Sequence, residues 1–489
     1  MTFSGNILAV DVGSSSVRCS VYGGSGGLIE GTSSARRHTF KRGPDGAAIL
    51  DAEDLAGLVF RAVDETLSKA EDIDGGISAV ATSTFWHGML GVDARGRPTT
   101  PIFTWADRRA ATAARELKQS LDEKEVHRRT GSVFHSSYWP AKLLWLSRTD
   151  PDAFSRTERF LSPGEYLHLK LFGEASVGLS MASGTGLLDQ NRKAYDGELL
   201  AALPIDEGKL SPISDEPLVG LGAEWAGRWP ALRGVPWFPA VGDGGCSNVG
   251  SGCATQGRLT LMVGTSGAMR VLWEADYTEM PEGLWCYRAD ARRFVAGGAL
   301  SDGGNMVEWL RGTLRLPDDR EAEELLSRME PDAHGLTFLP LLAGERGPGW
   351  ADEANGVLAG LSLGTTPTEI LRAAMEAVAL RFALIAERLD AAFPAEPGAR
   401  EVVATGGGLL GSPTWVRIMA DALGRPVTIS GVREASSRGA ALLAAEALGG
   451  PRIEEVAAPL DETHQPDEGR HEIYRRALER QRKLYDAVM

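Results

Sequence analysis

The sequence predicts an α/β protein with two similar domains, and three observations support this prediction. The chain has 489 residues, roughly two to three times the usual length of one domain. Segments with strand-like and helix-like periodicity alternate along it. The early stretch LAVDVGSSSVRCSVY (8–22) has a close echo, LTLMVGTSGAMRVLW (259–273). We therefore expect two domains, residues 1–245 and 246–489, with a cleft between them.

The two halves show the same order of elements. In the first half, NILAVDVG and RCSVYGG predict two strands joined by a glycine and serine turn, 51–70 has helical spacing, and GGISAVATST predicts another strand. The second half repeats the hairpin at 258–273. A long helix is expected at 368–393, a strand and glycine turn at 400–408, and a helix at 413–424. The Pro-rich and Gly-rich stretch 232–245 is the expected crossing between the halves.

Composition excludes several classes of protein. The chain is 43% hydrophobic and 24% charged, without a run of 18 apolar residues, and its start lacks a basic leader. We therefore expect a cytoplasmic protein with no signal peptide and no membrane partner. The formal net charge of −15 argues against a nucleic-acid partner. The 4 cysteines have neither zinc-site spacing nor the number of a disulfide scaffold, and are predicted to be core residues.

The two predicted hairpin turns contain the first candidate residues for binding phosphate and a metal ion. Gly13 permits a tight turn, and Ser14, Ser15 and Ser16 place hydroxyls beside backbone N–H groups, which suits phosphate oxygens. Asp11, at the end of the first strand, is a candidate ligand for Mg²⁺. Two such turns facing each other across a cleft could clamp a polyphosphate, with one carboxylate for one metal. No GxxxxGK[ST] sequence is present, so a P-loop is excluded. The echo keeps Gly264, Thr265 and Ser266 but has Met262 in place of the aspartate.

Three patterns resemble a known superfamily. The D-x-G-[ST]-[ST]-S-x-R pattern, the second GTSG turn and the late GGG turn resemble the sugar kinase, Hsp70 and actin superfamily. GVLAGLSLGTTPTEILRAAME (356–376) resembles the C-terminal signature of the FGGY family of carbohydrate kinases, and SSYWPAKLLWL (136–146) keeps Lys142 and Trp145 of its N-terminal signature but displaces the proline. The resemblance implies two duplicated ribonuclease H-like (actin-like ATPase) domains. It also implies ATP and Mg²⁺ as cofactors, and transfer of the γ-phosphate to a sugar hydroxyl.

The resemblance also assigns roles to residues. Asp243, in PAVGDGGCSNVGSG, stands where the family has its catalytic base. Asp11 would hold Mg²⁺. Glycines at the late turn would let the nucleotide approach the backbone; Arg417 replaces a glutamine that is frequent in the helix that follows. The residues expected to bind the nucleotide are Gly13, Ser14, Ser15, Ser16, Arg18, Gly264, Thr265, Ser266, Gly304, Gly406, Gly407 and Gly408.

Four segments bear on which sugar the protein binds. TWAD (104–107), GTSGAMR and LLAGERGPGW (341–350) resemble gluconokinase-like members, whereas the His-Gly at 87–88 resembles xylulokinase-like members. We therefore expect gluconate, with a pentulose (xylulose or ribulose) as the alternative. Arg108 or Arg109 could contact the carboxylate of gluconate. The expected substrate-binding residues are Trp86, His87, Trp105, Asp107 and Asp243.

Other classes of function remain as alternatives. A sugar-responsive regulator would keep the fold without catalysis, but no helix-turn-helix precedes the first strand. An Hsp70-like or actin-like machine would lack the segment around Asp243. The expected partners are ATP and a small-molecule sugar or sugar acid, and a homodimer is left open.

Overall fold

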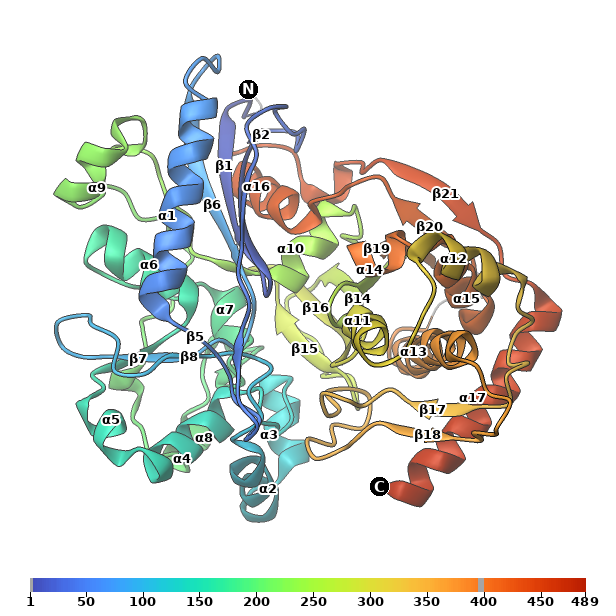
Figure 1. Ribbon diagram of the computed structural model, residues 1–489. Coiled ribbons are helices and arrows are strands. Elements are labelled where there is room, and N and C mark those ends of the chain that lie inside the picture. The colour runs from blue at the N-terminus through green and yellow to red at the C-terminus, as the bar shows by residue number, and fades with distance from the viewer. Residues whose placement is uncertain (1–2, 395–399) are drawn as a thin grey trace.

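The two halves of the chain form two lobes. The structure is a computed structural model that describes residues 3–394 and 400–489. In Figure 1 the first half, blue to green, lies mostly on the left and the second half, yellow to red, mostly on the right, except for helix α16 (Ala435–Ala447), which lies against the first half. No helix among the described residues combines the length and apolar composition needed to span a bilayer.

The first lobe is built on a five-stranded sheet in the order β12-β6-β1-β2-β3. Its strands are β1 (Asn6–Val12), β2 (Ser16–Gly23), β3 (Ser34–Arg37), β6 (Ile77–Thr84) and β12 (Val241–Gly242). β1 and β2 form the predicted antiparallel hairpin, and β6 runs parallel to β1. Helix α1 (Ala52–Lys69) begins where the carboxylate of Asp51 accepts a hydrogen bond from the N–H of Asp54. Its apolar residues pack with β1 and β2 in one hydrophobic cluster.

The rest of the first half is a set of short elements beside this sheet. They supply the segments that later surround the candidate site. The strands are β4 (Lys41–Arg42), β5 (Ala48–Leu50), β7 (Leu90–Val92), β8 (Ile102–Phe103), β9 (Arg159–Leu161), β10 (Leu188–Asp189) and β11 (Ala194–Tyr195). The helices are α2 (Ala111–Ser120), α3 (Glu123–Thr130), α4 (Trp139–Thr149), α5 (Pro151–Arg156), α6 (Pro163–Phe172), α7 (Leu179–Ser183), α8 (Gly197–Ala201) and α9 (Ala223–Arg228).

The second lobe repeats this arrangement in a seven-stranded sheet, in the order β15-β16-β14-β13-β19-β20-β21. The hairpin of β13 and β14 is antiparallel and β19 runs parallel to β13, as β6 does to β1. The repeated topology confirms that the echo in the sequence reflects a duplicated α/β unit. The strands are β13 (Arg258–Val263), β14 (Gly267–Glu274), β15 (Trp285–Arg288), β16 (Arg293–Leu300), β19 (Glu401–Thr405), β20 (Val427–Ser430) and β21 (Leu460–His464).

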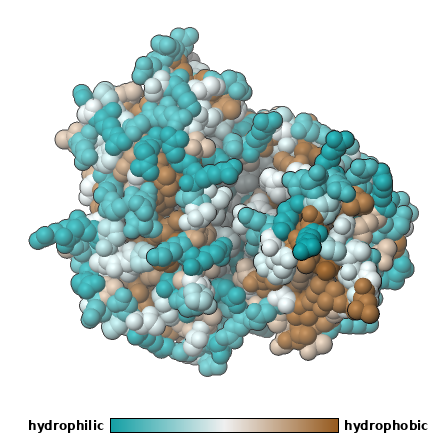
Figure 2. All heavy atoms as spheres, viewed as in Figure 1, coloured by the Kyte–Doolittle hydropathy of each residue, from teal (hydrophilic) through white to brown (hydrophobic). Residues whose placement is uncertain are grey.

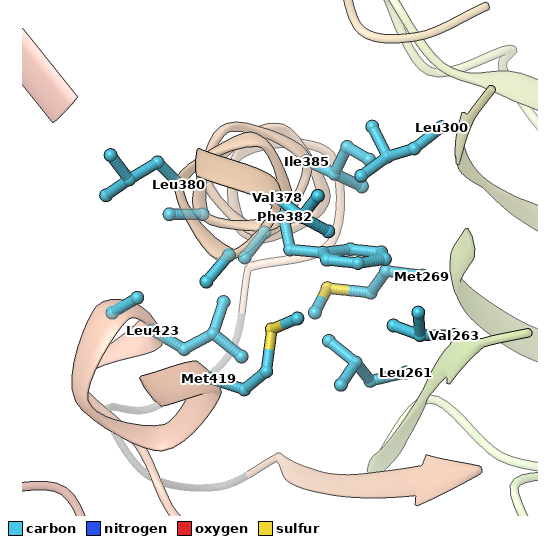
Figure 3. Packing of buried hydrophobic residues seen from close by; sticks show 14 of the residues in the cluster. Leu261, Val263, Met269, Leu300, Val378, Leu380, Phe382, Ile385, Met419 and Leu423 are labelled. Atoms are coloured by element: carbon cyan, nitrogen blue, oxygen red, sulfur yellow. The ribbon is translucent and has the colours of Figure 1, made fainter. Parts of the chain in front are cut away.

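The long predicted helix, α13 (Pro367–Ala392), forms the centre of the second core. A capping box of Thr366 and Glu369 starts it, with Pro367 at its first turn. Figure 3 shows Phe382 of α13 lying beside Met269 of the hairpin. The other elements of this half are β17 (Thr337–Leu339), β18 (Val357–Ala359), α11 (Gly304–Thr313), α12 (Asp319–Arg328), α14 (Gly407–Leu410), α15 (Pro413–Leu423) and α17 (Glu468–Val488). All four cysteines are free and buried, as expected of core residues.

Two helices join the lobes at very close range. α10 (Asp243–Gly250) packs on α16 (Ala435–Ala447), and α16 in turn packs on β1 and β6 of the first sheet. A Cβ atom at Gly439 would lie 1.8 Å from the carbonyl oxygen of Cys246, and one at Gly250 would lie 1.8 Å from that of Ala435. Only glycine permits this approach. The division that we propose after residue 245 therefore falls inside α10.

Candidate active site

Each hairpin turn is closed by a backbone hydrogen bond from its glycine, which spans residues 13–16 in the first turn and residues 264–266 in the second. The N–H of Gly13 donates to the carbonyl oxygen of Ser16 at 2.9 Å, and the N–H of Gly264 donates to that of Ser266 at 2.9 Å. Gly304 lies against the second turn, because its N–H donates to the carbonyl oxygen of Gly264 at 2.8 Å. The second turn is therefore held against the start of α11, whose first residue is Gly304.

Both turns border one cavity of about 460 Å³, which we call the turn cavity. Figure 2 shows the surface hollowed between the two lobes. Three arginines line the turn cavity, and of these only Arg18 is among the predicted residues. The sequence reasoning missed Arg37 and Arg42, whose only signal was the local concentration of basic residues. The lining residues are Ser14, Ser15, Ser16, Arg18, Arg37, His38, Thr39, Phe40, Arg42, Trp105, Thr265 and Glu308.

Asp11 lies beneath the first turn. It is buried and faces Arg18 across the hairpin, with 3.5 Å between Oδ2 of Asp11 and Nη1 of Arg18. Burial raises the pKa of Asp11 to about 7, and the charge of Arg18 opposes this shift. Its Oδ1 is sealed from solvent and has no hydrogen-bond partner among the described residues. An unpartnered carboxylate oxygen beside a phosphate-sized cavity fits a Mg²⁺ ligand, direct or through water.

A second, smaller cavity of about 70 Å³, here called the tryptophan recess, lies beside the turn cavity. It brings together four of the five predicted substrate-binding residues, Trp86, His87, Trp105 and Asp243, from segments far apart in the sequence. Its full lining is Ser14, Phe85, Trp86, His87, Trp105, Asp243, Gly244, Met262, Ser266, Gly267, Ala268, Arg270, Trp285, Ala299 and Arg346.

The packing of Trp86 explains the glycines around the recess. Its Nε1 donates to the carbonyl oxygen of Ser180 at 3.0 Å, and its ring fills the space that side chains would otherwise take. A Cβ would lie 1.9 Å from the ring at Gly242, 2.5 Å at Gly244 and 2.3 Å at Gly184. The glycines that flank Asp243 therefore let the aspartate reach the recess beside the indole.

Asp243 is the first residue of α10, directly after β12. Its Oδ1 accepts a hydrogen bond from the N–H of Gly244 at 2.8 Å. Burial raises the pKa of Asp243, and the nearby charge of Arg270 opposes this shift more than that of Arg346 does. The carboxyl is thus a stronger base than an exposed aspartate.

His87 is held rigidly at the wall of the recess. Its Nδ1 lies 2.5 Å from the carbonyl oxygen of Gly184, and its own carbonyl accepts a hydrogen bond from Nζ of Lys142 at 2.6 Å. Its backbone has a φ of 67°, rare for a residue other than glycine. Burial, together with the charge of Arg346, holds the pKa of His87 well below its usual value. The imidazole is therefore neutral near pH 7.

The structure places Asp107 outside the recess lining. One of its oxygens accepts a hydrogen bond from the N–H of Ala48 at 3.2 Å, and both bind the guanidinium of Arg109. Arg109 also stacks over Trp145, 4.7 Å from the ring centroid. Arg108 donates to the backbone carbonyl of Asp352. Neither arginine considered for the substrate carboxylate lines the recess. Arg270 and Arg346 do, in segments whose resemblance was noted without assigning these residues a role.

The late glycine turn lies against the second hairpin. A Cβ at Gly406, whose φ is 88°, would lie 2.5 Å from the carbonyl oxygen of Val263. Gly408 and Gly304 border a cavity of about 250 Å³ between α11, α12 and α15, whereas Gly406 and Gly407 do not line it. The lining residues are Gly304, Val307, Arg311, Asp319, Ala322, Glu323, Leu326, Leu371, Met375, Gly408, Gly411, Ser412 and Trp415.

The chain matches known proteins over most of its length. Residues 6–250 match the N-terminal domain of the FGGY family of carbohydrate kinases, and residues 259–448 match its C-terminal domain. A gluconokinase of Bacillus subtilis is 27% identical, and the match covers 91% of this chain and 88% of the relative.

Two solved structures from Lactobacillus acidophilus are similar over both whole chains. A gluconate kinase has a TM-score of 0.88 at 25% identity, with 99% of this chain and 98% of the other covered. A xylulose kinase has a TM-score of 0.88 at 26% identity, with the same coverage. These matches confirm the expected actin-like ATPase fold. The chain belongs to the FGGY family of carbohydrate kinases, phosphotransferases that use an alcohol group as acceptor.

Proposed function

We propose that the protein phosphorylates gluconate on its terminal hydroxyl with ATP. The observation that carries this proposal is the charge of the tryptophan recess. Two guanidinium groups, Arg270 and Arg346, line it, and Asp243 is the one acidic residue among its lining residues. His87 adds no positive charge at neutral pH, so the recess favours an acceptor that is itself an anion. The gluconokinase and gluconate kinase relatives support the same choice.

In this proposal each of the three cavities binds one part of the substrates: the adenosine, the phosphates or the acceptor. The adenosine lies in the cavity of Gly304 and Gly408, and the phosphates lie in the turn cavity between the two hairpins. Asp11 holds Mg²⁺, which neutralises charge on the phosphates. Arg18, Arg37 and Arg42 supply fixed positive charge around them.

The acceptor lies in the tryptophan recess with its terminal hydroxyl beside Asp243. Asp243 takes the proton of that hydroxyl as the oxygen attacks the γ-phosphorus. The raised pKa of Asp243 suits this role, since a stronger base accepts the proton more readily. The indole rings of Trp86 and Trp105 give the carbon chain an apolar wall.

A pentulose kinase is the second candidate. The xylulose kinase structure is as similar to this chain as the gluconate kinase structure is. His87 also lies in the recess, as a xylulokinase-like segment would require. A neutral ketose, however, would offer no anionic group to Arg346.

An acceptor panel tests the proposal. ADP release would be measured with MgATP and gluconate, xylulose, ribulose, glycerol and related sugar acids and polyols. We expect the highest kcat/KM with gluconate. The Asp243→Asn variant controls for contaminating kinases and should lose about 10²–10⁴-fold in kcat while retaining ADP binding. Highest activity on a pentulose would contradict the choice of gluconate, and near-normal turnover by Asp243→Asn would contradict the proposed base.

A further inference from the structure

Arg346 is a cation without an internal partner. It lies in the segment between β17 and β18, and its Nε is sealed from solvent without a hydrogen-bond acceptor among the described residues. The neighbouring Glu345 does not neutralise it, because that carboxylate binds Arg381 and the hydroxyl of Tyr485. Burial lowers the pKa of Arg346, which means that its surroundings disfavour the charge. The charge of Asp243, which lines the same recess, favours the charged form of Arg346. No carboxylate among the described residues forms an ion pair with Arg346, so its guanidinium can bind an anionic group of a ligand.

The orientation of Arg346 leaves its donors available. The guanidinium carbon lies 4.8 Å from the ring centroid of Trp105, and that indole is fixed by a hydrogen bond from its Nε1 to Oγ of Ser14 at 2.9 Å. An arginine stacked on an aromatic face keeps its N–H groups in the plane of the guanidinium, where they can bind a carboxylate with two parallel hydrogen bonds.

The surroundings of Arg346 place it on the acceptor side of the site. The charge of Arg346 acts to lower the pKa of His87, Tyr138 and Tyr287. The hydroxyls of the two tyrosines are hydrogen-bonded to each other. The turn cavity, proposed for the phosphates, has arginines of its own and does not include Arg346. Arg346 also borders a narrow space together with Arg42 and Thr265, which line the turn cavity. Its place in the recess beside Asp243 and His87 is what favours an anionic group of the acceptor.

Arg270 has a different task. Its Nη1 donates to the carbonyl oxygen of Gly244 at 3.0 Å, and it opposes the rise in the pKa of Asp243 more than any other group does. Burial and the charge of Arg346 lower the pKa of Arg270, to about 10. Arg270, in β14, is thus anchored beside the catalytic base, whereas the guanidinium of Arg346 makes no hydrogen bond with the described residues.

We infer that Arg346 binds the carboxylate of the acceptor and makes the site select sugar acids over neutral polyols and ketoses. This inference rests on the proposed function, since it assigns the specificity of the same recess. It replaces Arg108 and Arg109 as the expected contacts of the carboxylate.

The experiment compares an acid with its neutral analogue. Gluconate and sorbitol, which has CH₂OH in place of the carboxylate, would be titrated calorimetrically and assayed as acceptors with the wild type, Arg346→Met and Arg346→Lys. Arg95→Met is the matched control, because it removes the same charge from an exposed turn. ADP binding and circular dichroism verify that each variant is folded.

We expect Arg346→Met to lose about 10²–10³-fold in affinity and in kcat/KM for gluconate. The affinity and kcat/KM of Arg346→Met for sorbitol should differ from the wild-type values by less than about threefold, as expected when no contact with the acceptor is lost. Arg346→Lys should lie in between, because it keeps the charge but loses the two-pronged geometry. Arg95→Met should match the wild type.

Two results would overturn the inference. In the first, Arg346→Met binds gluconate as tightly as the wild type does. In the second, Arg346→Met loses activity equally on gluconate and sorbitol, which would mean that Arg346 contacts the phosphate or only stabilises the folded protein. The outcome for the proposed function is separate. If the wild type prefers another sugar acid and Arg346→Met loses it, gluconate is wrong and the inference stands. A wild type that uses only neutral sugars overturns both.

Discussion

Replacing Lys142 with methionine should change how the stability of the protein depends on pH. Lys142 is buried, and its Nζ donates to the carbonyl oxygens of His87 at 2.6 Å and Phe103 at 3.3 Å. Burial lowers its pKa from 10.5 to about 7, although the charge of Asp107 opposes this shift. Methionine has a similar length but no ionisable group.

The sign and size of this change in stability follow from the number of protons bound by the folded and the unfolded chain. Between the folded and unfolded pKa values the unfolded chain holds the proton that the folded protein has released, so stability rises with pH. Each tenfold change in proton affinity is about 1.4 kcal/mol. Between pH 7 and pH 9 the Lys142 contribution to the free energy of unfolding should therefore rise by about 2 kcal/mol. Below pH 7 both states hold the proton and this dependence disappears.

Urea unfolding at pH 7 and pH 9, followed by tryptophan fluorescence, measures the difference. The wild type should gain about 2 kcal/mol relative to Lys142→Met over this interval. Lys118→Met, at an exposed position, should show the wild-type dependence. The same pH dependence in wild type and Lys142→Met would mean that the buried amine titrates as an ordinary lysine, and the reasoning would be wrong.

Two further predictions concern the metal and the joint between the lobes. Asp11→Asn should raise the Mg²⁺ concentration needed for half-maximal turnover by about 10–100-fold, measured by Mg²⁺ titration at saturating ATP; an unchanged requirement would remove Asp11 from the metal site. Gly439→Ala should destabilise the protein by about 1–3 kcal/mol, because its Cβ would meet the carbonyl oxygen of Cys246. Thermal unfolding tests this, with Gly227→Ala, in open space, as a control that should be nearly neutral.

The sequence predicts those parts of the fold and the site that depend on residues close together in the chain. The two hairpins and α13 follow from short patterns of apolar residues and glycine, whereas Asp243 was assigned through the resemblance to the FGGY family. Trp86 was expected at the substrate, but its support by Gly184, Gly242 and Gly244 comes from separate segments that no pattern in the sequence links.

Asp107 and Arg346 show why the remaining residues could not be assigned. Asp107 lies in the TWAD segment, yet the side chain of Arg109, two residues later, binds both of its oxygens. Arg346 reaches the recess because the segment between β17 and β18 brings it onto Trp105. The hydrophobic periodicity of the sequence predicts the strands on either side of such a segment, but it does not predict where the segment between them runs.

The stack of Arg346 on Trp105 has a consequence for how acceptor preference is inherited. Trp105, His87 and Asp243 lie before the division after residue 245, whereas Arg270 and Arg346 enter the recess from the second half of the chain. A chimera that joined the first half of this protein to the second half of a ketose kinase would combine one parent's aromatic wall with the other's electrostatics. Because both arginines of the recess lie in the second half, we expect such a chimera to take its preference for an acid or a neutral acceptor from the second parent.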